Sequence, residues 1–285
     1  MVKRIKSPGI ITVFFVMLFS LFLLLPFVPL IIWSFTKYWP WPLLLPEKWS
    51  MDSWRYLFSA SGRAGEGLFN SLIVAVLTLV GNMVLGIPAA RVLAQNEFRG
   101  KMIVFSILLA PLFIPYTVSI MGMYDFAIRL DFINDYLSVA FAHLIITLPY
   151  FVATIWFQFR LIGAKYQEAA ASLGASVSKI FFWIEWPLLL PAVLLGSFLV
   201  MVISFSQYLP TWIMSGGTML TIPVVIFPFA SSGNSSIVSA YSLLFFVPIL
   251  VLMLVYFLLM RINSRKQFIN RGEDIAIRTN KHSNQ

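Results

Sequence analysis

Long uncharged apolar runs dominate the pattern of the chain, and short basic or Gly/Ser-rich segments separate them. Four runs contain no Asp, Glu, Lys or Arg, and they cover residues 10–36, 68–90, 102–124 and 136–159. A fifth run, from residue 186 to residue 260, is too long for one helix, because about 20 helical residues cross the hydrocarbon core of a bilayer. Its turn-forming clusters divide it into spans near 186–212 and 238–260. We therefore predict an all-α polytopic membrane protein with six transmembrane helices.

The composition excludes most soluble functions. Hydrophobic residues make up 60% of the 285 residues, charged residues make up 11%, and the mean hydropathy is +0.88. Soluble domains carry about 25% charged residues, so a water-soluble enzyme is excluded. The sequence contains no cysteine, which excludes a disulfide framework and cysteine-ligated metal sites.

The Lys and Arg residues set the predicted topology. With the N-terminus inside, most of the 20 basic residues fall on the cytoplasmic side, as the positive-inside rule requires. The net charge of +9 then reflects orientation in the membrane, so no nucleic-acid partner is predicted, and the basic tail is expected near anionic membrane lipid. The predicted parts are a cytoplasmic N-terminus at 1–9, a first helix at 10–36, an extracytoplasmic segment at 37–67, a five-helix core at 68–262 and a cytoplasmic tail at 263–285.

The loop between the fourth and fifth spans, at 164–187, differs from the other inside loops. Its residues from Glu168 to Leu173 favour a helix, and Gly174 can end that helix in the left-handed conformation. Ser176 can then cap a second short helix, and Pro187 fits the first turn of the next span. The predicted product is a helix–Gly–helix elbow that projects from the membrane. Such a shape suits docking into a cleft of another protein.

Six positions in this loop resemble the EAA loop of the permease subunits of binding-protein-dependent ABC importers. They are Glu168, Ala169, Ala170, Gly174, Ile184 and Pro187. Family members usually have Leu directly before the proline, where this chain has Trp186, so the local packing is expected to differ. Weaker matches lie at 70–72, 98–101 and 148–150. The resemblance implies a type I ABC importer permease fold over 68–262, and it implies that the six residues couple this chain to an ATPase.

The energy source must lie in another chain. No Walker-type Gly-x-x-x-x-Gly-Lys-Ser/Thr loop occurs in this sequence, and such a loop would be needed to bind ATP by that route. The resemblance implies two ABC ATPase subunits that bind ATP and Mg, a second permease subunit and an extracytoplasmic solute-binding protein. It favours a permease heterodimer over a homodimer, in a bacterial plasma (inner) membrane with both termini cytoplasmic. This chain is expected to be a transport subunit that binds no cofactor or metal, not an enzyme.

Two other classes of protein are alternatives. An ion-coupled secondary carrier usually places ionisable residues inside its spans, and here the spans offer only His143. A membrane scaffold or insertase-like chaperone would leave the elbow unexplained. Both alternatives are therefore disfavoured.

Polar residues within the spans are candidates for the translocation pathway. They are Ser204, Ser206, Gln207, Tyr208 and Asn82. These residues either line a cavity or hydrogen-bond to neighbouring helices, and both interpretations stay open. The substrate is also open. Segments 205–211 and 216–223 resemble permeases for polyamines, thiamine and ferric ion, but sugar importers share the same elbow, and phosphonate is a further alternative.

Overall fold

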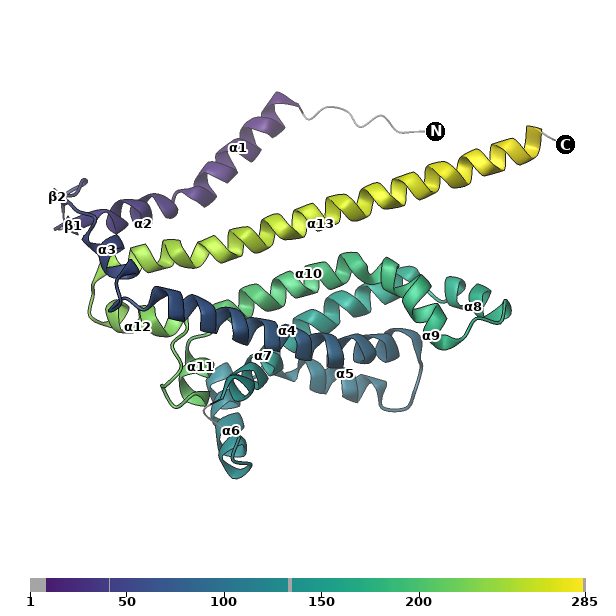
Figure 1. Cartoon of the computed structure of the whole chain (residues 1–285), viewed down its shortest axis with the longest axis horizontal. Coiled ribbons are helices and arrows are strands. Elements are labelled where there is room, and N and C mark those ends of the chain that lie inside the picture. The colour runs from purple at the N-terminus through teal and green to yellow at the C-terminus, as the bar shows by residue number, and fades with distance from the viewer. Residues whose placement is uncertain (1–8, 41, 133–134, 284–285) are drawn as a thin grey trace. The chain divides into compact units, whose positions relative to one another are not determined.

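The computed structural model describes residues 9–40, 42–132 and 135–283, with the backbone alone at residues 10, 116 and 263–283 (Figure 1). The chain is almost wholly helical and divides into two compact units. The first unit comprises the chain up to Gly65 together with Val225–Phe246, and the second comprises Glu66–Val224 with the chain from Val247 onward. The lipid contact expected for the tail at 263–285 depends on side chains that are not among the described residues. Residues 1–8 of the predicted cytoplasmic N-terminus also lie outside the described residues.

The first unit contains the first apolar helix and the segment that follows it. Its elements are α1 (Ile10–Leu24), α2 (Phe27–Ser34), β1 (Thr36–Tyr38), β2 (Lys48–Trp49), α3 (Asp52–Phe58) and parts of α12 (Ile222–Ser231) and α13 (Ser235–Ser283). The two strands form an antiparallel pair in which Thr36 faces Trp49. Tyr241 of α13 is fully buried, donates a hydrogen bond to the carbonyl of Gly62 and stacks on Phe229. Tyr241 thereby ties α13 to α12 and to the turn after α3.

The second unit is built around α7, against which α4 and α10 pack. Its elements are α4 (Ala64–Gln95), α5 (Lys101–Leu109), η1 (Ala110–Leu112), α6 (Tyr116–Arg129), α7 (Tyr136–Ile162), α8 (Lys165–Ser172), α9 (Val177–Ile180), the π-helical η2 (Phe181–Glu185), α10 (Trp186–Phe205) and α11 (Leu209–Met214), together with the start of α12 and the part of α13 from Val247. Phe151 of α7 is fully buried. A Cβ added at Gly86 of α4 or at Gly196 of α10 would come within 2.7 or 2.8 Å of its ring. Glycine at both positions therefore lets the helices approach closely.

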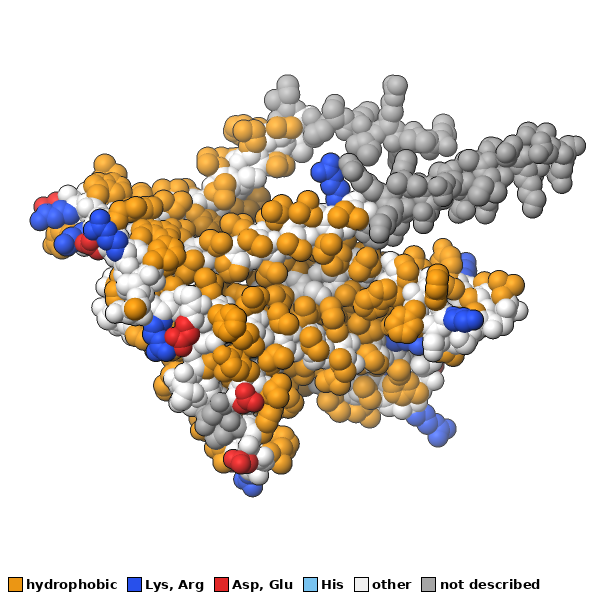
Figure 2. Space-filling view, in the orientation of Figure 1, with side chains coloured by type: hydrophobic (Ala, Val, Ile, Leu, Met, Phe, Trp, Pro, Cys, Tyr) orange, Lys and Arg blue, Asp and Glu red, His pale blue; other side chains and the backbone are white. Residues whose placement is uncertain are grey.

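The predicted membrane-spanning helices are confirmed, with one qualification in their number. Within the described residues five helical segments are long and apolar enough to cross a membrane: Ile11–Ser34, Ala64–Gln95, Tyr136–Ile162, Val177–Phe205 and Ser235–Ile262. The count reaches six if one bent pair of helices is taken as a single span. Figure 2 shows the apolar side chains that cover most of the visible surface, as expected for a protein solvated by lipid.

The bent pair occupies the apolar run at 102–124, where the sequence indicates one continuous helix. Its arms, Lys101–Leu112 and Thr117–Arg129, meet at 104°. Pro111 lies in η1 and Pro115 directly precedes α6, and neither residue has a backbone N–H to continue a helix. The first arm rises only about 18 Å, which is less than the ~30 Å hydrocarbon core. The predicted span at 102–124 is therefore a sharply bent pair of helices, and it counts as the sixth span only if the two arms are taken together.

The fifth span is shifted from the expected 186–212. Helical structure is continuous from Val177 to Phe205, because α9, η2 and α10 follow one another without a break. The helix then ends, and Ser206–Tyr208 precedes the short helix α11. The turn clusters that separate the last spans are confirmed, since Gly216, Gly217 and Gly233 all have positive φ.

Candidate functional site

The first half of the elbow has the predicted local structure. Helix α8 ends in a Schellman motif, in which the amide of Gly174 donates to the carbonyl of Ala171 (2.9 Å) and the amide of Ala175 donates to that of Ala170 (3.1 Å). Gly174 has φ +79°, and no atom lies within 4 Å of a Cβ built on it. The backbone conformation, and not lack of space, therefore favours glycine at this position.

The second half of the elbow differs from the prediction. Ser176 occupies the N-cap position of α9 with extended backbone angles, but its side chain makes no capping hydrogen bond. The helix that begins at Val177 does not end before Pro187; it continues into α10. The expected second short helix is therefore the first part of the fifth span, and only α8 is a separate helix.

The six residues of the loop motif lie on different faces of the elbow. Glu168 and Ala169 are exposed on α8, while Ala170 is buried against the protein. Ile184 is half-buried within η2, and Gly174 and Pro187 are exposed. Glu168 stands in the first turn of α8, where a carboxylate interacts favourably with the helix dipole.

An exposed apolar surface surrounds the motif, although the sequence pattern did not single it out. Its members are Leu173 (88% exposed), Val177, Phe182 and Trp183 (82% exposed). Figure 1 shows α8 and α9 at the end of the second unit, near the turn between α4 and α5. We call these four residues the elbow surface. Large apolar side chains this exposed at a helix turn are suited to a protein cleft.

Sequence reasoning missed a buried ion pair behind the elbow. Glu185 is fully buried, and its Oε1 accepts a hydrogen bond from Nη2 of Arg91 on α4 at 2.9 Å. The side-chain amide of Gln167 on α8 donates to the same oxygen. The guanidinium of Arg91 also lies 5.5 Å from the ring centre of Phe181. Because Arg91 and Glu185 are 94 positions apart, no local pattern in the sequence pairs them.

Two of the pathway candidates make buried hydrogen bonds between helices. Ser204 of α10 bonds to Nδ1 of His143 at 2.9 Å, and the other ring nitrogen of His143 bonds to Thr211 of α11 at 3.0 Å. Asn82 of α4 donates to the hydroxyl of Thr147 of α7 at 2.7 Å. These bonds fit the interpretation in which such residues join neighbouring helices.

The other three candidates lie together in the break between α10 and α11. Ser206 is exposed there, and Gln207 and Tyr208 are half-buried. The regular helix is interrupted at these residues, as is common where a backbone lines a cavity at membrane depth. Among the described residues, no group of three or more His, Cys, Asp or Glu side chains could hold a metal ion.

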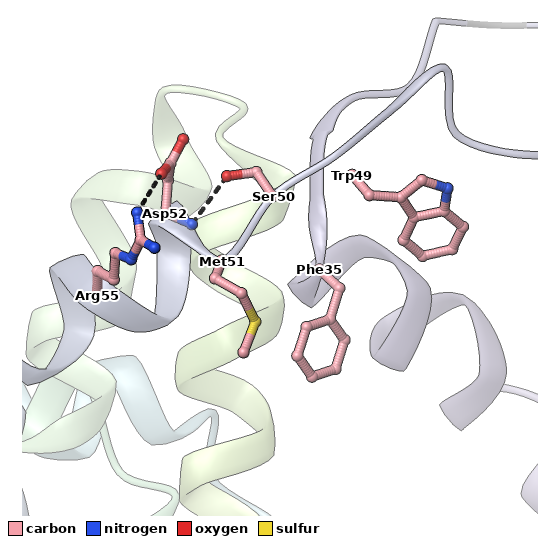
Figure 3. Close-up of a pocket in the computed structure, with 6 residues that line it drawn as sticks. All are labelled: Phe35, Trp49, Ser50, Met51, Asp52 and Arg55. Atoms are coloured by element: carbon pink, nitrogen blue, oxygen red, sulfur yellow. Dashed lines mark hydrogen bonds and ion pairs between the residues drawn. The ribbon is translucent and has the colours of Figure 1, made fainter.

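A hollow lies in the first unit, between the strand pair and α3 (Figure 3). It has a volume of about 630 Å³ and is lined by Phe35, Trp49, Ser50, Met51, Asp52 and Arg55. Asp52 forms ion pairs with Lys37 (3.6 Å) and Arg55 (3.9 Å). A hydrogen bond from Ser50, together with these two cations, holds the pKa of the Asp52 carboxyl below its usual value. The ion pairs are exposed, so they contribute little to stability.

Comparisons with known proteins place this geometry in a family context. No family model matches the chain. It is 32% identical over 133 residues to the molybdate/tungstate transport system permease protein WtpB of Pyrococcus abyssi, covering 46% of this chain and 53% of that protein. It is 33% identical over 176 residues to the molybdenum transport system permease protein ModB of Mycobacterium tuberculosis, covering 56% and 66%. The chain thus spans about half to two thirds of the length of these relatives.

A further relative and a solved structure cover more of the chain. The spermidine/putrescine transport system permease protein PotC of Escherichia coli is 27% identical over 185 residues, which are 65% of this chain and 70% of that protein. A crystal structure of a bacterial ABC transporter that imports the polysaccharide alginate matches with a TM-score of 0.62 and 17% identity. The match covers 87% of this chain and 94% of that one. The predicted type I permease fold is confirmed.

Proposed function

The chain belongs to the permease subunits of binding-protein-dependent ABC importers, and we propose that it forms half of a solute pathway driven by a separate ATPase. The observation that carries this function is α8, an exposed helix ended by a left-handed glycine and flanked by the elbow surface. Its relatives are transport-system permeases by name, which favours an importer over an ion-coupled secondary carrier.

The partners follow from this role. Two ABC ATPase subunits bind ATP and Mg, and each permease subunit inserts its elbow into a cleft of one of them. A second permease subunit completes the pathway, with a heterodimer favoured, and both termini of this chain lie in the cytoplasm. Glu168 and Ala169, exposed on α8, face the ATPase, while Ala170 and Ile184 hold the elbow against its own core. Gly174 and Pro187 fix the direction of the helices on either side.

Solute selection belongs to an extracytoplasmic binding protein. Relatives of this chain are named for solutes as different as molybdate/tungstate and spermidine/putrescine. A common permease scaffold therefore serves several solute chemistries. Within this chain Ser206, Gln207 and Tyr208 are the proposed pathway residues, since they lie where the helix is interrupted.

Co-purification with the ATPase tests the proposal. Glu168→Lys replaces a carboxylate on the exposed face of α8, and Gly174→Val places a β-branched residue at φ +79°. Both variants should insert into the membrane normally and lose the ATPase. Gly100→Val is the matched control, because Gly100 has φ +85° and open space around it but lies in the turn before α5.

The control variant should keep the ATPase bound. If the two elbow variants also retain the ATPase at the parental level, the elbow is ordinary connecting structure and the coupling role is wrong.

A further inference from the structure

The buried ion pair behind the elbow joins helix α4 to two elements of the elbow, α8 and η2, that lie far from it in the sequence. Glu185 ends the π-helical turn η2, Arg91 lies near the end of α4, and Gln167 lies on α8. We call these three residues the elbow junction. Of its charged members, Glu185 is fully buried and the side chain of Arg91 is 28% exposed. A buried carboxylate keeps its charge at acceptable cost only while its cation and hydrogen-bond donors stay in place.

The π-helical turn aligns Glu185 with the core side of its helix. Ile180, Glu185 and Leu189 are all buried, with a spacing of five residues across η2 and four residues in α10. A regular α-helix favours spacings of three or four, so the π turn accommodates the wider first interval. The same turn leaves Phe182 and Trp183 exposed on the elbow surface. One local distortion therefore serves both the junction and the surface.

Helix α4 extends from the junction to the opposite end of the second unit. Asn70, near its start, donates a hydrogen bond to the carbonyl of Leu220 at 2.8 Å, and Ser71 accepts one from the amide of Ile222 at 3.1 Å. About 30 Å of helix separates these residues from Arg91. Pro88 lies three positions before Arg91 and removes one backbone hydrogen bond. Helix α4 thus connects the elbow to the segment that leads into the first residue of α12.

We infer that Arg91 and Glu185 are positioning residues that make α4 follow the elbow when an ATPase moves it. The inference rests on the proposed function, since it assumes that an ATPase docks on α8. Displacement of α8 pulls on Gln167, and η2 and α4 follow because each supplies one partner of the buried pair. Helix α4 then carries the displacement to the hydrogen bonds at Leu220 and Ile222. Without the pair, the elbow still docks but moves without α4.

The absence of cysteine from the sequence makes this testable with paired spin labels in the full chain. Asn96→Cys and Ser172→Cys place labels after α4 and on α8, at exposed positions. Pulsed electron spin resonance on the chain in lipid nanodiscs gives the distribution of distances between them. The double variant Arg91→Met/Glu185→Met removes both charges together, which avoids leaving one buried charge unpaired. We expect its distribution to be broader than that of the parental pair.

Arg160→Met is the matched control. Arg160 also lies over an aromatic ring near the end of its helix, 5.9 Å from the centre of Trp156, but it has no place in the junction. Its distance distribution should equal the parental one. An unchanged distribution in the double variant would overturn the inference, whether or not an ATPase binds.

A second label pair measures whether movement of the elbow reaches the far end of α4. A merely structural role of the ion pair would not affect this movement. Leu72→Cys on α4 and Leu137→Cys on α7 are exposed positions far from the junction. In the complex with its co-purified ATPase, MgATP should shift the distance between them, and the double variant should retain ATP hydrolysis but lose the shift. A parental shift in the double variant would also overturn the inference. Failure of the parental chain to co-purify any ATPase would instead contradict the proposed function.

Discussion

The turn between α4 and α5 and the elbow lie at the same end of the second unit (Figure 1). Each contains an exposed glycine with positive φ, Gly100 at +85° and Gly174 at +79°. They differ in how they are attached. Lys101 pairs with the exposed Glu97 four positions away, whereas the elbow is attached through the buried Glu185. The ion pair of the α4–α5 turn therefore joins neighbouring residues, whereas the ion pair behind the elbow joins two helices that are far apart in the sequence.

The largest expected difference between the two turns comes from removing the cation of each pair. Arg91→Met leaves Glu185 buried without its charge partner, and breaking a buried pair in this way costs about 3 kcal/mol or more. Lys101→Met removes the partner of an exposed carboxylate and should leave stability unchanged within error. Reversible unfolding in mixed micelles measures both. Equal losses in the two variants would contradict the distinction between buried and local pairing.

Replacing each of the two glycines with alanine should separate the stability cost of the backbone conformation from the loss of ATPase binding. Gly100→Ala and Gly174→Ala both place a Cβ at positive φ with no neighbour within 4 Å, so each should cost about 1 kcal/mol through the backbone alone. Only Gly174→Ala should weaken ATPase binding, because only the elbow docks. Thermal unfolding and quantitative pull-down of the same preparations test this. A matching loss of ATPase binding in Gly100→Ala would place part of the interface on the α4–α5 turn.

The smallest expected effect is the pH response of the α4–α5 turn. A hydrogen bond from Lys101 and its charge lower the pKa of Glu97. A lowered carboxyl pKa stabilises the folded turn above the pKa of the unfolded chain, and this contribution is lost as the pH falls through the folded pKa. Lys101→Met should therefore raise the pKa of Glu97 toward its usual value. Carbon-13 NMR of the Glu carboxyl groups follows this titration, and an unshifted pKa would show that the ion pair is absent in solution.

Much of the fold could be predicted because its main signals are local. Uninterrupted apolar runs locate the helices, and the helix formers before Gly174 predict its left-handed C-terminal turn. The break near Pro115 was missed although its prolines are visible, because hydropathy averages over them. The end of α10 at Phe205 was missed because the apolar run continues beyond it.

The contacts of the site could not be predicted in the same way. In the sequence, Arg91 is one of many basic residues between apolar runs, and Glu185 is one acidic residue in the loop at 164–187. Their pairing depends on how α4 and η2 pack, which no spacing along the chain encodes. The hydrogen bonds of Asn82 and Ser204 are likewise products of packing, so the sequence left their role between pathway and helix contact open.

The ring of Phe151 sits between two glycine backbones, with its Cδ1 edge toward Gly86 of α4 and its Cδ2 edge toward Gly196 of α10. A single flat ring therefore acts as a spacer whose width sets the separation of these helices. Because neither glycine carries a side chain, both backbones reach the ring directly, and a Cβ at either position would have to displace the ring or its helix. The thickness of one aromatic side chain thus sets how closely three helices can pack at the centre of the bundle.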